Sequence, residues 1–505
     1  MSKTAPPGPQ PTGLLPTGFL LGVATSGYQI EGGFNGPGEP ANNWVRFELA
    51  GKVAPSGAAC DFWRRPEEAL ERAAAIGCNA FRLSVEWARL EPEEGIFDEA
   101  ALGRYAEILA ACRRRGLEPI VTLHHFTHPW YLGEEFWLTP GSPDRFAAHV
   151  DRVVPALADH CRHWVPVNEP NVLALMGWVQ GTYPPGRTAA FADAWAVVDN
   201  LLTAHVLAHE VIHDHQSEAV VTCNPDASTL YDQDRLLTDL LVARSLGVDR
   251  HKLDRWVDER RALHTFAAPP PDLLDHGLRL LYAAASPYGE VGTAGLATAL
   301  RRRLRRPCPR RVVDAVYAGR HERPLDAVGF DWYDPVASHG MRLPGHRSAG
   351  GERRWSASRA LWDVETDPDG LEHWCAEMHA FVPGAPVWVV ENGMATRVQG
   401  GRADGRSDGV TRPEYLRRHL AAVVRAADAG VPVGAYLHWS LVDNYEWGSY
   451  EPRLGLFGMD RRGREPRWLD LDAAGDDSAG EFRRLATALR GGDRAALDEP
   501  PGGLR

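Results

Sequence analysis

The chain has 505 residues, of which 44% are apolar and 24% charged, and this ordinary globular balance excludes a disordered or fibrous protein. The 55 basic and 67 acidic residues give a net charge of −12 at pH 7, which argues against general nucleic-acid or anionic-membrane binding. No signal-peptide pattern or run of about 18 apolar residues occurs. Seven cysteines without CxxC spacing are typical of reduced thiols. We therefore expect a soluble, cytoplasmic protein with neither a nucleic-acid nor a membrane partner.

Eight short apolar segments recur along the chain, and amphipathic segments separate most of them. Their near-continuous Val, Leu, Ile and aromatic residues predict strands buried on both faces, hence a parallel sheet. Eight such strands alternating with helices are typical of a (β/α)8 barrel, an α/β fold. A doubly wound sheet is disfavoured because no Gly-rich phosphate loop follows the first strand. The predicted strands are 19–25, 80–85, 119–124, 163–168, 219–224, 326–333, 386–391 and 433–439.

Two of the predicted helices carry clear start signals. Segment 66–77 opens with Pro66, a residue favoured at the first helical position. Segment 412–429 follows Thr411, and Glu414 stands three residues further on, which is the capping-box pattern. Both segments therefore predict helices that cover the barrel.

The long segment 225–325 exceeds one crossover helix. Its Arg-rich part, 300–311, predicts a solvated helix face rather than a nucleic-acid site, because aromatic residues are not interleaved with the arginines. The Gly-, Arg- and Ser-rich segments 339–359 and 397–409 predict long loops on the barrel rim. We expect a single domain, with these boundaries: a disordered tail at 1–13, the barrel at 14–490 and a second disordered tail at 491–505.

Polar residues stand at the ends of most predicted strands, where barrel enzymes place their active sites. Glu169 and Glu391 each follow a wholly apolar strand directly and precede a tight turn. Two carboxylates on opposite walls of a cavity are what cleavage of a glycosidic bond requires. The strand-end polar residues are Gln29, Glu31, Arg82, Ser84, Glu86, His124, His125, Asn168, Glu169, Asp331, Tyr333, Glu391, Asn392, Trp439 and Ser440.

Five stretches of this chain resemble motifs of the family 1 β-glycosidases, in the same order and over about residues 17–485. These stretches are ATSGYQIEGG (24–33), FRLSVEWARLEP (81–92), VNEPN (167–171), VVENG (389–393) and HWSLVDNYEW (438–447). The resemblance implies a (β/α)8 barrel that cleaves the non-reducing terminal sugar from small β-glycosides with retention. It implies hydrolysis or transglycosylation through a covalent glycosyl-enzyme, with no metal or cofactor.

The resemblance also implies a role for each matching residue. Glu169 matches the acid/base and Glu391 the nucleophile, with Arg82 and Tyr333 in the positions that support the nucleophile. The matching sugar-binding residues are Asn168 for the 2-hydroxyl, Gln29, His125, Glu446 and Trp447 for the other hydroxyls, and Trp439 for the stacking platform.

Departures from the family pattern bear on the substrate. Phe126 follows His125 where the family has Trp, and Asp331 stands where the family has a neutral Asn. Asp331 is thus a specificity candidate for a cationic sugar or aglycone; alternatively, it is bound to a main-chain donor or a rim arginine. The thioglucosidase branch lacks the acid/base Glu, and the 6-phospho branch replaces the Glu at 446 and carries a Lys-containing loop. This chain has both glutamates and no Lys after residue 252, so we expect neither specialised activity.

Two other classes of function compete with this interpretation. HEVIH (209–213), with His205 one turn earlier, has the form of a zinc peptidase helix, but 200–205 resembles an outer helix of the glycosidase barrel. HHFTH (124–128) could ligate a metal, but adjacent strand residues point to opposite faces. A barrel that only binds sugars typically lacks one of the two glutamates. We expect an enzyme without a metal site, and a homo-oligomer is compatible with the sequence.

Overall fold

The computed structural model describes residues 13–228, 230–264, 282–290, 308–334, 347–348, 351–352, 366–399, 402–404, 406, 408–463 and 465–498. Eight parallel strands close into a barrel, in the order β1-β2-β3-β4-β5-β6-β9-β12 with β12 beside β1. The predicted (β/α)8 barrel is therefore confirmed. The strands are β1 (Leu20–Ala24), β2 (Ala80–Ser84), β3 (Glu118–Thr122), β4 (His163–Val165), β5 (Val220–Cys223), β6 (Ala327–Trp332), β9 (Val387–Asn392) and β12 (Val433–Trp439).

Alternation along each strand explains why the strands read as continuous apolar runs. One set of side chains fills the barrel interior and the other packs against the surrounding helices. On β2, for example, Ala80 belongs to the interior cluster and Phe81 to the outer one. Other interior residues are Ala24, Ile120, Val165, Ala327, Val390, Ala435 and Leu437.

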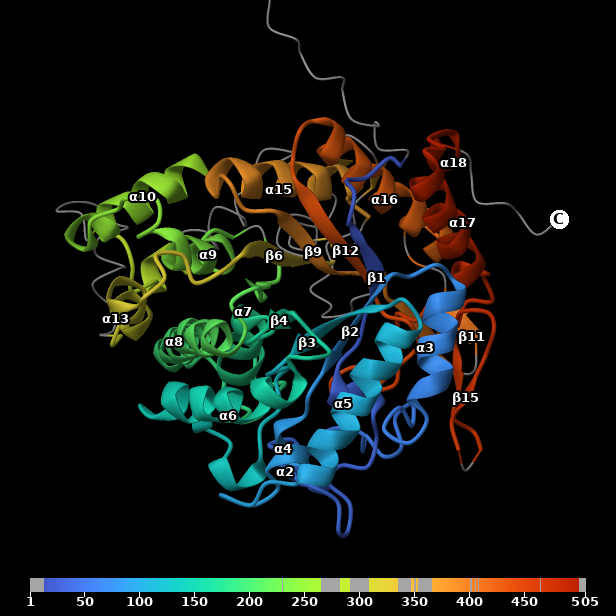
Figure 1. The fold of residues 1–505 in the computed structure, drawn as a ribbon, viewed down its shortest axis with the longest axis horizontal. Coiled ribbons are helices and arrows are strands. Elements are labelled where there is room, and N and C mark those ends of the chain that lie inside the picture. Colours follow the sequence, from blue (N-terminus) through green and yellow to red (C-terminus); the bar gives the residue numbers. More distant parts are fainter. Residues whose placement is uncertain are drawn as a thin grey trace, which may run out of the picture.

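Helices surround the barrel in a ring (Figure 1). The predicted start signals are present: α3 begins at Pro66, and α16 begins after Thr411, whose Oγ1 accepts from the Glu414 backbone N at 3.4 Å. The longer helices are α3 (Pro66–Ala75), α5 (Glu99–Arg114), α6 (Ser142–Leu157), α8 (Phe191–His215), α9 (Arg235–Val242), α10 (Leu253–Leu263), α13 (Arg311–Ala318), α15 (Pro368–Phe381), α16 (Arg412–Asp428) and α17 (Ser478–Gly491).

The remaining helices and strands are short. The short helices are α1 (Gly27–Ile30), α2 (Val45–Leu49), α4 (Trp87–Leu90), α7 (Pro170–Ala174) and α18 (Ala495–Asp498). The short strands are β7 (Arg347–Ser348), β8 (Gly351–Glu352), β10 (Thr396–Gln399), β11 (Arg402–Asp404), β13 (Pro452–Arg453), β14 (Met459–Asp460) and β15 (Arg467–Trp468).

Two local predictions need correction. The expected loop at 397–409 contains an antiparallel hairpin of β10 and β11, and β10 also pairs with β13. The expected C-terminal tail from 491 is ordered through 498, because Ala496 and Leu497 of α18 are buried. Residues 1–12, 300–307 and 499–505, and most of the expected loop at 339–359, lie outside the described residues. No helix in the described ranges is both long and apolar enough to cross a bilayer.

Candidate active site

Two buried glutamates face each other at the C-terminal end of the barrel strands. Glu391 lies on β9, and Glu169 lies at the N-terminus of α7, shortly after β4. One carboxyl oxygen from each of Glu169, Asp331 and Glu391 lies within 4.8 Å of the others. Retaining glycosidases hold their two carboxyl groups about 5–5.5 Å apart and inverting ones about 6.5–9.5 Å apart. The separation here fits the retaining geometry.

Glu391 is held by two donors that favour its ionised form. The Arg82 guanidinium on β2 donates to Oε1, and the Tyr333 hydroxyl donates to Oε2 at 2.6 Å. Arg82 is itself oriented by a 2.9 Å hydrogen bond from its Nε to Thr122 Oγ1. Burial raises the pKa of Glu391, whereas Arg82 and Tyr333 lower it. These contacts suit a carboxylate that must attack as an anion.

Glu169 lies in a different electrostatic environment. Its Oε2 accepts from Asn168 Nδ2 at 3.2 Å, and no cation contacts it among the described residues. Burial raises the pKa of Glu169 well above its ordinary value, and the negative charges of Glu391 and Asp226 raise it further. Because Arg82 bonds Glu391 and not Glu169, the ionised form is favoured more at Glu391 than at Glu169. That difference between two neighbouring carboxyls is what an acid and a nucleophile require.

Asn168 connects the two glutamates to His125. Its Oδ1 accepts from Arg82 and, at 2.7 Å, from Asn224 Nδ2, while its Nδ2 lies 3.2 Å from His125 Nε2. Asn224 follows β5 and is absent from the strand-end residues selected from the sequence. Its signal was present, because it is a polar residue directly after the apolar strand VVTC.

Asp331 lies in one cluster of carboxyls with Glu169 and Glu391. It is fully buried, and its Oδ2 accepts from Asn224 Nδ2 at 2.6 Å. Its Oδ1 has no hydrogen-bond partner among the described residues. The two partners anticipated from the sequence, a main-chain donor and a rim arginine, are therefore wrong. Burial, then Glu391 and Glu169, raise the pKa of Asp331 well above its ordinary value.

Glu446 and Gln29 form a second polar group next to the Trp439 indole. Glu446 accepts from Gln29 Nε2 at 3.2 Å and from Trp439 Nε1 at 3.0 Å. Gln29 is fixed by Ser26, whose hydroxyl donates to Gln29 Oε1 at 2.7 Å. Burial, the largest influence, raises the pKa of Glu446 to about 7. The Glu446 carboxyl and the Gln29 amide thus lie beside the Trp439 indole. Together they offer the donors and acceptors that recognition of sugar hydroxyls requires.

Aromatic rings join the two polar groups. The His125 ring stacks at 5.7 Å from Trp439 and at 5.6 Å from Trp447. Phe126, which replaces the expected indole, packs 4.8 Å from Trp447. Every site residue predicted from the sequence therefore belongs to one connected set: Gln29, Arg82, His125, Asn168, Glu169, Asp331, Tyr333, Glu391, Trp439, Glu446 and Trp447.

Three residues of this set and its border have a left-handed backbone. The φ angles of Phe126, Glu169 and Trp447 are 69°, 35° and 43°. A residue other than glycine in this region costs about 1–3 kcal/mol, and such residues cluster at functional sites. The backbone thus carries strain where the aromatic and acidic side chains meet.

Two other strand-end residues, Glu86 and His124, and the helical His205 serve the scaffold. Glu86 accepts from the Tyr28 backbone N at 3.0 Å and from Thr127 Oγ1 at 2.7 Å. His124 accepts from Trp137 Nε1 at 3.1 Å, on the side of the strand away from His125. His205 Nε2 lies 2.7 Å from the Pro324 carbonyl oxygen. None of these three side chains contacts Glu169 or Glu391.

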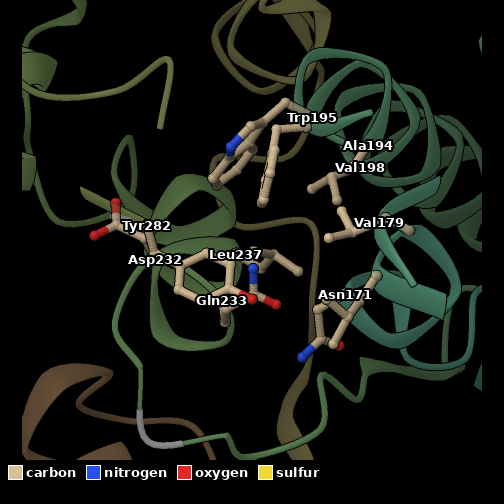
Figure 2. Close-up of a pocket in the computed structure, with 12 residues that line it drawn as sticks. Asn171, Val179, Ala194, Trp195, Val198, Asp232, Gln233, Leu237 and Tyr282 are labelled. Atoms are coloured by element: carbon tan, nitrogen blue, oxygen red, sulfur yellow. The ribbon is translucent and has the colours of Figure 1, made fainter. Parts of the chain in front are cut away.

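A small pocket lies between α7, α8 and α9 (Figure 2). Asn171, Trp195, Asp232 and Tyr282 are among its lining residues. Asn171 donates to the Asp226 carbonyl oxygen at 2.8 Å. Neither Glu169 nor Glu391 lines the pocket, so it is distinct from the connected set above.

Comparisons with known proteins agree with this geometry. The profile of glycosyl hydrolase family 1 matches residues 12–258 and 328–469. The chain is 27% identical to 6-phospho-β-galactosidase 1 of Streptococcus pneumoniae serotype 4, covering 88% of this chain and 94% of that protein. It is also 27% identical to the 1,4-β-D-glucan glucohydrolase of Thermotoga neapolitana, covering 88% and 97%. The family 1 β-glucosidase from Thermotoga maritima has the same fold, with a TM-score of 0.67 at 23% identity over 96% and 99% of the two chains. The chain therefore belongs to glycosyl hydrolase family 1, a family of retaining enzymes that hydrolyse O-glycosidic bonds.

Proposed function

We propose that this enzyme removes the non-reducing terminal sugar from small, non-phosphorylated β-glycosides, with Glu391 as nucleophile and Glu169 as acid/base. One observation carries the assignment of roles. Arg82 and Tyr333 both donate to Glu391. Glu169, which has a carboxyl oxygen within 4.8 Å of one of Glu391, accepts only from the Asn168 amide among the described residues. The more strongly stabilised carboxylate is the nucleophile, and the other carboxyl keeps the proton that the leaving group needs.

The first step forms the glycosyl-enzyme. A Glu391 oxygen attacks the anomeric carbon, the bond from that carbon to the aglycone oxygen breaks, and the Glu169 proton passes to the departing oxygen. In the second step, the Glu169 carboxylate takes a proton from water, whose oxygen attacks the anomeric carbon and breaks its bond to Glu391. The free sugar leaves with its β configuration, and both carboxyls return to their initial states. An alcohol in place of water gives a transglycosylation product.

The charge of the site supports a sugar without phosphate. Asp331 adds a third buried carboxyl to those of Glu169 and Glu391, and the partly buried Glu446 has no cationic partner among the described residues. A phosphate dianion near these groups would be destabilised, because buried like charges disfavour one another. This interpretation sets the chain apart from its 6-phospho-β-galactosidase relatives, which makes the phosphorylated substrate an essential comparison.

A second substrate class is favoured by Asp331. Its Oδ1 is buried, has no partner within the described part of the chain and lies in the cluster with both glutamates. An amino group on the sugar or a basic aglycone would give this oxygen a donor and offset its charge. We therefore propose amino-bearing β-glycosides as substrates to compare with neutral ones.

The cellular setting is inferred from the cysteines and the charge. All seven cysteines are unpaired, and six of them are buried. Free thiols are typical of a reducing compartment, which supports the cytoplasm. The net charge of −12 supports a small-molecule partner over nucleic acid.

Trapping the glycosyl-enzyme tests the roles. The wild type is incubated with a 2-deoxy-2-fluoro-β-glucoside that carries a dinitrophenyl leaving group, and intact mass and peptide mapping follow. We expect one adduct on Glu391, none in Glu391→Gln, and a normal adduct in the control Glu118→Gln, whose carboxyl lies at the start of β3. An adduct on another residue, or inverted product by NMR, would contradict the assignment. Parallel kinetics with β-glucosides and their 6-phosphates test the sugar, and faster turnover of the phosphates would refute that part.

A further inference from the structure

A cluster of histidines lies on the outer surface of the barrel, far from the catalytic pair. His209 and His213 are one turn apart on α8 and face Asp326, which directly precedes β6. His213 Nε2 lies 2.9 Å from Asp326 Oδ2, and His209 Nε2 lies 3.7 Å from the same oxygen. One ligand atom from each of the three residues lies within 4.8 Å of the other two.

His209 is the unusual member of this cluster. Its side chain is 1% exposed, and neither ring nitrogen has a hydrogen-bond partner among the described residues. Burying a polar group without a partner costs free energy, and such groups in native proteins call for an explanation. A ligand at its Nε2, which points toward Asp326, would supply that partner.

The distances match the ligand shell of zinc. Tetrahedral zinc binds imidazole nitrogen at about 2.0–2.1 Å, so neighbouring ligand atoms are about 3.3 Å apart. The observed 2.9 and 3.7 Å separations bracket that value. The exposed His321 packs its ring nearby, 4.9 Å from His209 and 5.2 Å from His213, but only the other three residues bring ligand atoms within 4.8 Å of one another. His213 Nδ1 lies 3.3 Å from the Ser217 carbonyl oxygen, which orients Nε2 toward the site.

We propose that His209, His213 and Asp326 form a structural site for one divalent transition metal, with Zn²⁺ as the best fit and the fourth position left to water. The site joins α8 to the start of β6, where Asp326 also accepts from the Val221 backbone N at 2.9 Å. It lies at the N-terminal end of the barrel, which in this fold contributes to stability rather than chemistry. This proposal departs from the sequence-based expectation of an enzyme without a metal.

The same segment contains the HExxH pattern, but the site is not built for peptide hydrolysis. A zinc peptidase uses the Glu of this pattern as a general base beside the metal. Here Glu210 Oε1 accepts from the Arg320 backbone N at 2.5 Å, and Oε2 lies 3.7 Å from Arg320 Nε. Glu210 therefore holds the loop before β6 in place, which is a structural task.

Metal binding to the untagged, full-length protein tests the proposal. After chelator treatment and removal of the chelator, Zn²⁺ or Co²⁺ is added and unbound metal is removed by gel filtration. We expect one Zn²⁺ per chain by elemental analysis, the intense visible absorption of tetrahedral Co²⁺, and a rise in Tm of about 3 °C with Zn²⁺. Absence of retained zinc and of a Co²⁺ spectrum in the wild type would overturn the proposal.

Matched variants locate the metal. His209→Gln and Asp326→Asn should lose the bound zinc, the Co²⁺ spectrum and the Tm rise. His215→Gln, on the same helix but paired with Asp151, should keep all three. Equal loss in His215→Gln, or full retention in both His209→Gln and Asp326→Asn, would refute the assignment. If His209→Gln fails to fold, the proposal is tested by zinc retention in Asp326→Asn and by the Co²⁺ spectrum of the wild type. Turnover of an aryl β-glucoside is expected to stay within about 2-fold in folded variants, because the site is remote from the catalytic pair.

Discussion

Asn224 joins Asp331 to Asn168: its Nδ2 lies 2.6 Å from Asp331 Oδ2 and 2.7 Å from Asn168 Oδ1. Both N–H bonds of this amide are thereby used. Asp331 is consequently held in the same hydrogen-bonded network as Arg82 and Glu391. Its Oδ1, however, has no hydrogen-bond partner among the described residues. Any effect of Asp331 on catalysis passes through its position in this set and through its charge.

Asp331→Asn should separate neutral from amino-bearing substrates. The variant keeps an acceptor for Asn224 but removes the carboxylate near the sugar. For an amino-bearing β-glycoside, kcat/KM should fall about 10-fold relative to its neutral counterpart, because a partly screened charge pair contributes about 1–2 kcal/mol. The measurement is kcat/KM for the paired substrates. An equal change for both would show that Asp331 does not select for a cation.

Tyr333→Phe should shift the acid limb of the pH profile. The Tyr333 hydroxyl lowers the pKa of Glu391, so its loss raises that pKa and leaves the nucleophile protonated at higher pH. A hydrogen bond to a charged group contributes about 1.5–3 kcal/mol, so the midpoint of the acid limb of kcat/KM should rise by about 1–2 pH units. Tyr317→Phe, on α13, is the control and should leave the profile unchanged. An unshifted acid limb in Tyr333→Phe would contradict the proposed role.

Glu169→Gln should lose activity according to the leaving group. An activated phenol departs with little protonation, whereas an alkyl alcohol needs the proton of Glu169. We expect losses of at least about 10²-fold in kcat on alkyl β-glycosides and much smaller losses in the glycosylation step on dinitrophenyl glycosides. Pre-steady-state kinetics resolve that step from the second, which also uses Glu169. Equal losses across leaving groups would assign the proton to another residue.

Glu446→Gln should reduce the pH dependence of stability. Burial raises the pKa of Glu446 from 4.5 to about 7, so the folded state holds this proton more tightly than the unfolded chain does. The resulting stabilisation is complete below pH 4.5 and is lost as the pH rises through 7, by an amount on the order of 3 kcal/mol. The Tm of Glu446→Gln relative to the wild type should therefore be higher at pH 8 than at pH 5. The exposed Glu107→Gln is the control, and a Tm difference independent of pH would count against the ionisation of Glu446 in this pH range.

The barrel was predictable because its signal is local. Each strand is a short apolar run between helical segments, and helix starts such as Pro66 and Thr411 depend on neighbouring residues only. The β10–β11 hairpin was missed because β11, Arg402–Asp404, contains no β-branched or aromatic residue. The helix α18 was missed because Gly491 and Gly492 suggest an end, whereas Gly492, at φ 76°, turns the chain back toward α16.

The site was predictable as a set of residues but not as a network. Motifs indicate Asp331 and Asn168, yet only the fold brings Asn224 between them, from 107 and 56 residues away. The histidine cluster likewise depends on a residue that is distant in the sequence and that only the fold brings close. His209 and His213 form a visible pair in the sequence, while Asp326 is 113 residues from His213 and reaches it only through the pairing of β5 with β6.

The left-handed backbone at Phe126, Glu169 and Trp447 has a consequence for directed evolution. Glycine adopts such angles without steric penalty and asparagine with little, so either residue would relieve part of the strain at these positions. Selection for heat resistance alone would therefore favour substitutions that delete the Glu169 carboxyl, which we propose as the acid/base, or the Phe126 or Trp447 ring. A library for thermostable variants should hold these three codons fixed, and survivors that change them are expected to be stable proteins without turnover.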